Sequence, residues 1–262
     1  MSSNSLNIAA TGMAAQQQRV DTIANNIANV NTPGYRKAMA LFQDLVYQVQ
    51  RSVGAPTSEN NTIDLAGRIQ GLGVKLASII RSHEPGMVTK TDRPLDLVIE
   101  GRGFLQIEQP NEEIAYTRAG TLEVNPDGEL TTPDGYRLSP HITIPEGAME
   151  ITVNGDGQVF AKFPGQVAMQ NLGQIELATF PNAGGLKPIG HNLYIETNAS
   201  GNPITARPGM NGLGTLLQGY LESSNVNIVQ ELTDLITAQR SYEFNSKVIE
   251  TSDQMMETIH RM

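Results

Sequence analysis

The chain has 262 residues, contains no cysteine and no tryptophan, and carries a formal charge of −9 at pH 7. Without cysteine it can form no disulfide, no Cys-based zinc site and no thiol nucleophile. The acidic balance disfavours nucleic acid as a partner, because no run of basic residues offsets it. No stretch of about 18 residues is apolar enough to suggest membrane insertion, and the N-terminus lacks the basic and apolar segments of a cleaved signal peptide. These signals alone predict a cytoplasmic protein.

The first predicted element is a long helix followed by a turn, over residues 1–36. Apolar residues recur every seven positions, with others three or four residues on, which is the heptad pattern of a helix that packs along another helix. Asn31, Pro33 and Gly34 predict where this helix ends. The predicted packing residues are Leu6, Met13, Val20, Ile23, Ile27 and Val30.

Residues 37–73 form a connecting segment whose structure the sequence leaves open. Leu41, Leu45 and Val49 have helical i+4 spacing, but the β-rich end of the run favours a strand equally. Residues 51–73 are polar and glycine-rich, which predicts an extension or long loop.

Residues 74–222 have the pattern of a β-rich domain. Short apolar runs at residues 96–100 and 104–107 are bounded by Gly, Pro, Asn and Asp. Asp127-Gly128, Asp134-Gly135 and Asp156-Gly157 are typical of turns between hairpin strands.

The last predicted element is a helix within residues 223–262. Asn227 and Gln230 have the spacing of a capping box at its start. The fold class is therefore α+β, with long terminal helices that form a coiled-coil-like core and a β-rich middle domain. Apolar residues again recur at heptad spacing, and the predicted packing residues are Ile228, Leu232, Leu235, Tyr242, Ile249 and Met256.

The simplest use of two such helices is a hairpin within one chain. Both helices, however, carry further small or apolar residues off the main stripe: Ala14, Ala15 and Ala28 in the first, and Val229, Ile236, Val248 and Met255 in the second. A helix that is apolar on more than one side needs more than one partner. We therefore expect other copies of the chain to pack against these helices.

Both ends of the chain resemble the paired signatures of the bacterial flagellar rod and hook protein family. The first signature is residues 23–36 (IANNIANVNTPGYR), and the second begins at residues 224–227 (SNVN). Residues 41–48 and 193–197 are most similar to the distal rod members of that family. The resemblance implies a structural subunit that polymerises helically into the drive shaft carrying motor torque to the hook, with no enzymatic activity and no cofactor. The alternative is a proximal rod or hook-type axial subunit.

The resemblance also implies partners and a location. The partners would be further copies, proximal rod proteins, the hook protein, the P-ring and L-ring proteins and the type III export apparatus, with no nucleic acid and no membrane insertion. The location would be the basal-body rod that spans the periplasm, reached without a cleaved signal peptide, which replaces the cytoplasmic prediction. Phe42 and Val46 are similar to an export-gate element, although ordinary buried positions explain them as well. We also expect residues 52–66 to brace neighbouring subunits.

Other functions find less support in the sequence. The four histidines, His83, His141, His191 and His260, stand singly and lack the spacing of a metal site. No nucleophile, base and orienting group can be assembled. A cell-wall glycosidase would leave both heptads unexplained, and a coiled-coil adhesin or phage fibre would form a closed oligomer instead of an open polymer.

Overall fold

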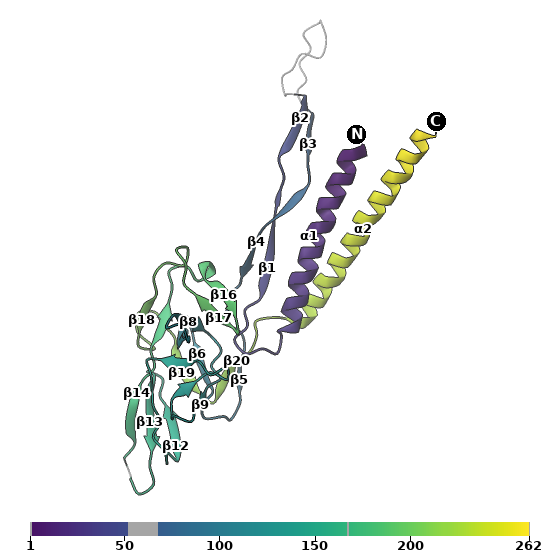
Figure 1. The fold of residues 1–262 in the computed structure, drawn as a ribbon. Coiled ribbons are helices and arrows are strands. Elements are labelled where there is room, and N and C mark those ends of the chain that lie inside the picture. The colour runs from purple at the N-terminus through teal and green to yellow at the C-terminus, as the bar shows by residue number, and fades with distance from the viewer. Residues whose placement is uncertain (1, 52–67, 167, 262) are drawn as a thin grey trace. The chain divides into compact units, whose positions relative to one another are not determined.

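The computed structural model describes residues 2–51, 68–166 and 168–261, which form two compact units (Figure 1). Unit 1 contains residues 1–27, 38–80 and 227–262, and unit 2 contains residues 28–37 and 81–226. These bounds differ from the domains expected from sequence. Residues 28–36 belong with the β-rich unit because their hydrogen bonds lie there, and the strand that begins at Val74 belongs with the helices.

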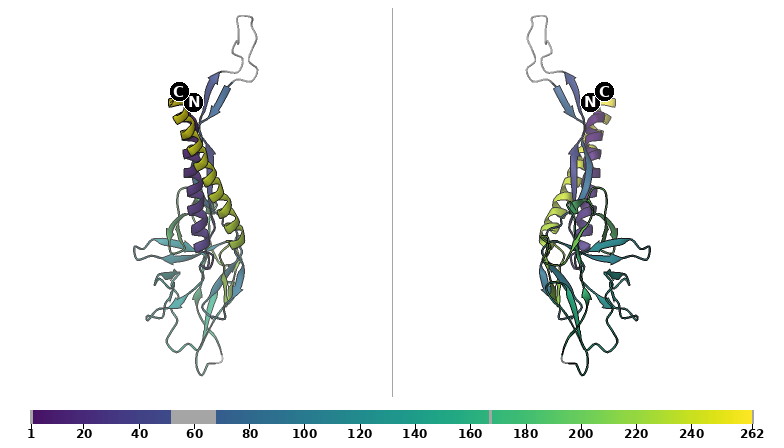
Figure 2. Two further views of the ribbon diagram at one scale, coloured as in Figure 1. Left: turned by 90° about the vertical axis from the view of Figure 1, so that its right-hand side faces the viewer. Right: turned by 90° about the vertical axis from the view of Figure 1, so that its left-hand side faces the viewer.

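Unit 1 is built around two antiparallel helices, α1 (Ser2–Ala28) and α2 (Ile228–His260), whose free ends lie together (Figures 1 and 2). A β ribbon runs beside α1. In this ribbon β1 (Ala38–Asp44) pairs with β4 (Val74–Arg81), and β2 (Tyr47–Arg51) pairs antiparallel with β3 (Arg68–Gly71). The Val74 N–H lies 3.4 Å from the Thr11 hydroxyl of α1 and donates to it.

The ribbon settles the segment that the sequence left open. Residues 38–44 and 47–51 are strands, so the helical alternative for residues 37–50 is wrong. The prediction of a loop over residues 51–73 is also wrong at Arg68–Gly71, because these residues pair with β2. The bracing segment, residues 52–66, lies outside the described residues and stays a prediction.

The predicted helix ends are largely confirmed. α1 ends at Ala28, just before the predicted Asn-Thr-Pro-Gly turn. The Asn227 side chain caps α2 by accepting hydrogen bonds from the N–H groups of Val229 and Gln230. The other half of the capping box is wrong, since the Gln230 amide donates forward to Asp234.

Unit 2 is β-rich, as predicted. Its largest sheet has nine strands: the path β16-β17-β8-β7-β11-β10-β9, with β15 beside β7 and β18 beside β15. A second sheet has the order β12-β13-β14, and β6 pairs with β19 and β5 with β20. The three predicted Asp-Gly turns lie between strands, and each of their glycines has a positive φ.

The strands of unit 2 are short, and their bounds are as follows: β5 (Val88–Lys90), β6 (Leu97–Glu100), β7 (Phe104–Glu108), β8 (Ile114–Thr117), β9 (Glu123–Val124), β10 (Leu130–Thr131), β11 (Arg137–Ser139), β12 (Glu150–Val153), β13 (Gln158–Lys162), β14 (Gln170–Gln174), β15 (Leu177–Thr179), β16 (Lys187–Gly190), β17 (Leu193–Ile195), β18 (Ile204–Ala206), β19 (Thr215–Gln218) and β20 (Tyr220–Glu222). A single 3-10 turn, η1 (Ala183–Gly185), precedes β16.

The core of unit 2 lies under the large sheet. Leu105 and Ile107 of β7 point into it together with Leu138 and Leu177 from neighbouring strands, and all four are fully buried. A smaller aromatic cluster includes Phe104, whose ring makes an edge contact with Phe180. Burying each large apolar side chain contributes about 1.5–3 kcal/mol, so this core is sufficient to hold the short strands together.

In unit 1, Asn26 joins three elements through one buried amide. Its Nδ2 donates to the Ala38 carbonyl at 2.9 Å and to Glu231 Oε2 at 3.0 Å, and its Oδ1 accepts from the Ala38 N–H at 2.9 Å. Asn26 and Glu231 are both almost completely inaccessible to solvent. One side chain of α1 therefore fixes the start of β1 and the first turns of α2.

In unit 2, Glu222 binds two arginines. Its Oε1 lies 2.8 Å from Arg36 Nη2 and its Oε2 lies 2.8 Å from Arg118 Nε. Arg36 and Glu222 are each only 2% exposed. Oε1 also accepts from the Gly86 N–H, and the Glu222 carbonyl accepts from the Gly34 N–H at 2.8 Å.

Gly34 allows the chain to approach Arg118. Its φ is +71°, and a Cβ at this position would lie 2.7 Å from the Ala119 nitrogen. A side chain here would meet both a strained backbone and an immovable neighbour. The proline-glycine turn after α1 therefore serves to place Arg36 beside Glu222.

Replacing Asn26 by alanine should destabilise unit 1. The change removes the partner of both Ala38 backbone groups and of one Glu231 oxygen, and each buried group left unsatisfied costs about 1–3 kcal/mol. The helical signal in far-UV circular dichroism should therefore melt several degrees lower. Asn7→Ala, on an exposed face of α1, is the matched control and should melt like the parent protein. A melting temperature of Asn26→Ala equal to that of the parent protein would contradict this role.

Replacing Glu222 by glutamine should destabilise unit 2. The shape is kept, but two buried guanidinium groups lose their counter-charge, which costs about 3–5 kcal/mol for a broken buried pair. Urea unfolding followed by tyrosine fluorescence should show the loss, since all tyrosine reporters of the aromatic cluster lie in this unit. Glu146→Gln, at an exposed carboxylate, is the control and should unfold at the same urea concentration as the parent protein. If Glu222→Gln also had the unfolding midpoint of the parent protein, the argument would be refuted.

Candidate assembly surfaces

Several contacts between the two helices of unit 1 are polar. We use the term interhelix seam for Gly12, Arg19 and Asn26 of α1 with Glu231, Asp234 and Asn245 of α2. Besides the Asn26–Glu231 bond, Arg19 Nη2 lies 3.9 Å from Asp234 Oδ1, and a Cβ on Gly12 would lie 3.0 Å from Asn245 Nδ2. Gly12 thus makes room for the Asn245 amide, which explains a residue that otherwise weakens a helix.

The predicted packing residues of α1 lie beside this seam and are only partly covered in a single copy. Ile23 is buried, whereas Leu6, Met13, Val20 and Ile27 are half-buried. Val30 follows the helix, belongs to unit 2 and is half-buried as well. Of the small residues off the stripe, Ala15 is buried, and Ala14 and Ala28 are exposed.

On α2 the predicted residues divide into two groups. Leu235, Ile249 and Met256 are half-buried, whereas Ile228, Leu232 and Tyr242 are exposed. The positions that one copy buries most completely are instead Glu231, Ala238 and Ser252. A single copy therefore covers small and polar positions of α2 and leaves large apolar ones uncovered.

Apart from Tyr242, the large apolar side chains exposed on α2 form two patches. The first patch consists of Ile228, Val229, Leu232 and Ile236, and the second of Phe244, Val248 and Met255. At 3.6 residues per turn, the centres of the two patches are separated by roughly 120° around the helix axis. Val229 is 70% exposed and Phe244 67% exposed. Two patches on different sides of one helix require two different covering surfaces.

The two residues of the predicted export-gate element lie at the end of β1 and just after it. Phe42 is half-buried in β1, and Val46, between β1 and β2, is 78% exposed. The alternative that both are ordinary buried positions therefore does not hold for Val46. Their role in export stays a prediction.

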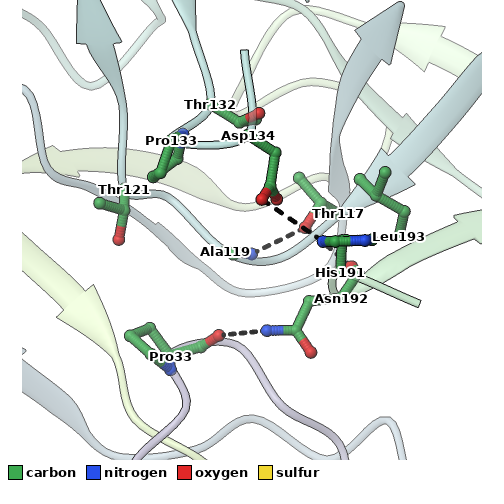
Figure 3. Close-up of a pocket in the computed structure, with 10 residues that line it drawn as sticks. All are labelled: Pro33, Thr117, Ala119, Thr121, Thr132, Pro133, Asp134, His191, Asn192 and Leu193. Carbon is green, nitrogen blue, oxygen red and sulfur yellow. Dashed lines mark hydrogen bonds and ion pairs between the residues drawn. The ribbon is translucent and has the colours of Figure 1, made fainter. Parts of the chain in front are cut away.

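A small cavity of about 230 Å³ in unit 2 has the residue types of a catalytic site but not the geometry (Figure 3). His191 Nδ1 lies 3.4 Å from Asp134 Oδ1. The nearby Thr117 hydroxyl, however, donates to the Asn192 carbonyl at 2.9 Å, and the Asn192 amide donates to the Pro33 carbonyl at 3.1 Å. These bonds hold the turn after α1 in place, and among the described residues no hydroxyl nucleophile hydrogen-bonds to the histidine.

The described histidines and metal-ligating side chains of the chain lie apart from one another or pack against other groups. Within residues 2–51, 68–166 and 168–261, no group of three metal-ligating side chains comes together. Neither α1 nor α2, as far as they are described, has an apolar stretch that would cross a membrane. His141 pairs with Glu108 at 2.8 Å, and His83 packs against the rings of Phe104 and Tyr194.

Sequence reasoning missed the residues that hold both signatures in place. Asn26, Arg36, Glu222 and Glu231 all fall within or beside the signature segments, but charged and amide side chains are normally assigned to the surface. Each has at least one polar neighbour in the sequence, so the local pattern gave no signal of burial. Only the repeated spacing of Gly12, Arg19 and Asn26, seven residues apart, could have indicated a second, polar heptad beside the apolar one.

Three family models match the chain. Residues 6–36 match the flagella basal body rod protein model, residues 98–161 the flagellar hook protein FlgE/F/G D1 domain, and residues 217–262 the flagellar basal body rod FlgEFG protein C-terminal model. The first and last of these ranges include α1 and α2 almost completely. The middle one begins in β6 and ends in β13.

Close relatives cover nearly the whole chain. The flagellar basal-body rod protein FlgG of Caulobacter vibrioides is 50% identical over 98% of both chains, and that of Bacillus subtilis is 38% identical over 95% of both. The flagellar hook-basal body complex protein FlhP of Bacillus subtilis is 33% identical over 96% of both chains. With the rod-type signatures at both ends, these relatives show that the chain belongs to the FlgG family of flagellar basal-body rod proteins, which are structural subunits and not enzymes.

Proposed function

We propose that this rod subunit polymerises helically through its terminal helices and forms the distal part of the shaft that carries motor torque to the hook. The observation that carries the proposal is the pair of apolar patches on α2. In the described part of α2, eight large apolar side chains remain exposed, seven of them in the two patches, although the chain's own core is well formed. Neighbouring copies are the surfaces that would cover them.

The geometry of the helices supports an open polymer over a closed dimer. The two patches are separated by roughly 120° around α2, so a single symmetric contact could cover only one of them. Contacts between different faces of the same chain build rings or open helices. The exposed alanines of α1, including Ala10, Ala14, Ala24 and Ala28, leave space for a further helix to approach closely.

Within the polymer, the predicted packing residues would acquire their full burial. Leu6, Met13, Val20 and Ile27 would complete their packing against copies, together with Ile228, Leu232 and Tyr242. A coiled-coil-like arrangement would thus form between chains more than within one. Each large side chain that becomes covered would contribute about 1.5–3 kcal/mol to assembly.

The proposed partners and route follow from this role. Further copies, proximal rod proteins and the hook protein would contact the shaft along its axis, and the P-ring and L-ring proteins would surround it where it crosses the periplasm. Export through the type III apparatus, without a cleaved signal peptide, would present Phe42 and Val46 in an unfolded chain. A proximal rod position is the second candidate, since the FlgE/F/G family model is shared among axial proteins. Labelled protein located along isolated rods decides between the two.

Placing charge in the first patch should abolish assembly without unfolding the subunit. In the double variant Leu232→Asp, Ile236→Asp, both side chains are exposed in one copy, so the melting of the monomer should change little. Burying two carboxylates between copies is strongly unfavourable, and rods should be absent from basal bodies of cells that carry only this variant.

The matched control is Ile204→Asp, an equally exposed apolar residue of unit 2. It should assemble rods and support swimming like the parent protein. Normal rods in the Leu232→Asp, Ile236→Asp double variant would contradict the proposal, because they would show that the first patch lies outside every contact between copies.

A further inference from the structure

A cavity of about 670 Å³ lies on unit 2 beside the Glu222 network. Its polar lining includes Arg36, His83, Arg102 and Arg118, and its walls include Phe104 and Phe180. Arg36 follows α1 and His83 follows β4, whereas Arg102 precedes β7 and Arg118 follows β8. The aromatic walls come from β7 and from the residue after β15. We refer to it as the arginine cavity.

The buried charges beneath this cavity do not balance. Two guanidinium groups, those of Arg36 and Arg118, share the single carboxylate of Glu222. The other hydrogen bonds of Arg118 go to neutral carbonyl oxygens, those of Ile99, Gly101 and Gly103. One positive charge in excess therefore remains in a nearly water-free place, where charges are normally paired.

The Arg36 side chain likewise lacks a hydrogen-bond acceptor for one of its nitrogens. Its Nη1 donates to the Glu84 carbonyl, but its buried Nε has no hydrogen-bond partner among the described residues. Arg81 adds a third guanidinium, which donates to the Arg36 carbonyl at 3.1 Å. These groups give the buried side of the cavity an excess of positive charge, while Glu84 lies on its exposed lining.

The surroundings of His83 oppose its protonation. Its pKa is lowered to about 4, because burial and the positive charges of Arg36, Arg81 and Arg118 all oppose its protonation. The imidazole is therefore neutral near pH 7 and adds no charge of its own. Its ring makes edge-to-face contacts with the rings of Phe104 and Tyr194.

At the rim, Arg102 is exposed, and its side chain makes no ion pair or hydrogen bond with any described residue. The chain as a whole is acidic, with a formal charge of −9, so an acidic group on another copy is electrostatically complementary to this rim. We propose that the arginine cavity receives an aspartate or glutamate side chain, flanked by apolar residues, from a second copy of the chain. The inference rests on the proposed polymer.

Charge reversal at the rim tests the inference. Arg102→Glu places a like charge where the incoming carboxylate should bind, and we expect the fraction of assembled rods to fall at least about tenfold. Arg102→Lys keeps the charge and should retain most of the assembly. Arg207→Glu makes the same charge change at another exposed arginine of unit 2 and should assemble normally.

The outcomes separate this inference from the function on which it rests. Normal assembly of Arg102→Glu, or an equal loss in Arg207→Glu, would overturn the docking of an acidic side chain while leaving the polymer intact. Failure of the unchanged protein to form rods would count against the proposed function itself. Unchanged melting of the Arg102→Glu monomer should show that folding is not the cause.

A cross-linking measurement identifies the occupant. Benzoylphenylalanine placed at position 181, on the exposed lip of the cavity, should form adducts between copies in assembled rods and none in the monomer. Mass spectrometry should find an aspartate or glutamate in the captured peptide. Adducts only within one copy, as expected if the exposed Glu84 on the lining fills the cavity, would overturn the inference, as would a captured peptide without an acidic residue.

Discussion

The buried carboxylate of Glu222 is the interaction on which much of the architecture depends. Through Arg36 it binds the segment just after α1, through Arg118 it binds the strands of the large sheet, and it lies itself at the end of the last strand before α2. Closing so long a stretch of chain has an entropic cost that grows only slowly with length. A charge-assisted, fully buried contact is strong enough to offset that cost.

In unit 1, a buried amide joins distant segments as the buried carboxylate of Glu222 does in unit 2. Asn26 binds the start of β1 and the first turns of α2, and the rest of the interhelix seam is small or polar. Such a seam contributes less hydrophobic stabilisation than an apolar heptad but defines one register, because a shifted pairing would leave buried polar groups without partners. The apolar side chains that a conventional helical hairpin would bury between its own helices remain available on the outside of α2.

Much of the secondary structure could be predicted from the sequence where local rules apply. The extent of both helices, the Asn227 cap and the Asp-Gly turns follow from spacing and turn chemistry alone. The segment at Leu41, Leu45 and Val49 was ambiguous for a definite reason, since a spacing of four matches both one helical turn and every second position of a strand. Its partner strands, β3 and β4, begin only at Arg68 and Val74, so no local signal could decide.

The candidate site was harder to predict because heptad spacing does not tell which apolar residues of α2 are buried within one copy. One copy leaves large apolar side chains of α2 exposed and buries polar ones. Leu232 and Tyr242 were expected in the helix pair and are exposed, whereas Glu231 and Ser252 are buried in it. The arginine cavity could not be predicted from the sequence either, because five segments that are far apart in the chain line it.

The central claim is that copies of the chain cover the apolar patches of α2. Since the chain has no cysteine, single cysteines report directly on accessibility. Maleimide labelling of Val248→Cys should be fast in the monomer and strongly slowed in assembled rods, while Lys187→Cys, exposed on unit 2, should label at the same rate in both. Equal labelling of Val248→Cys in monomer and rod would contradict the account.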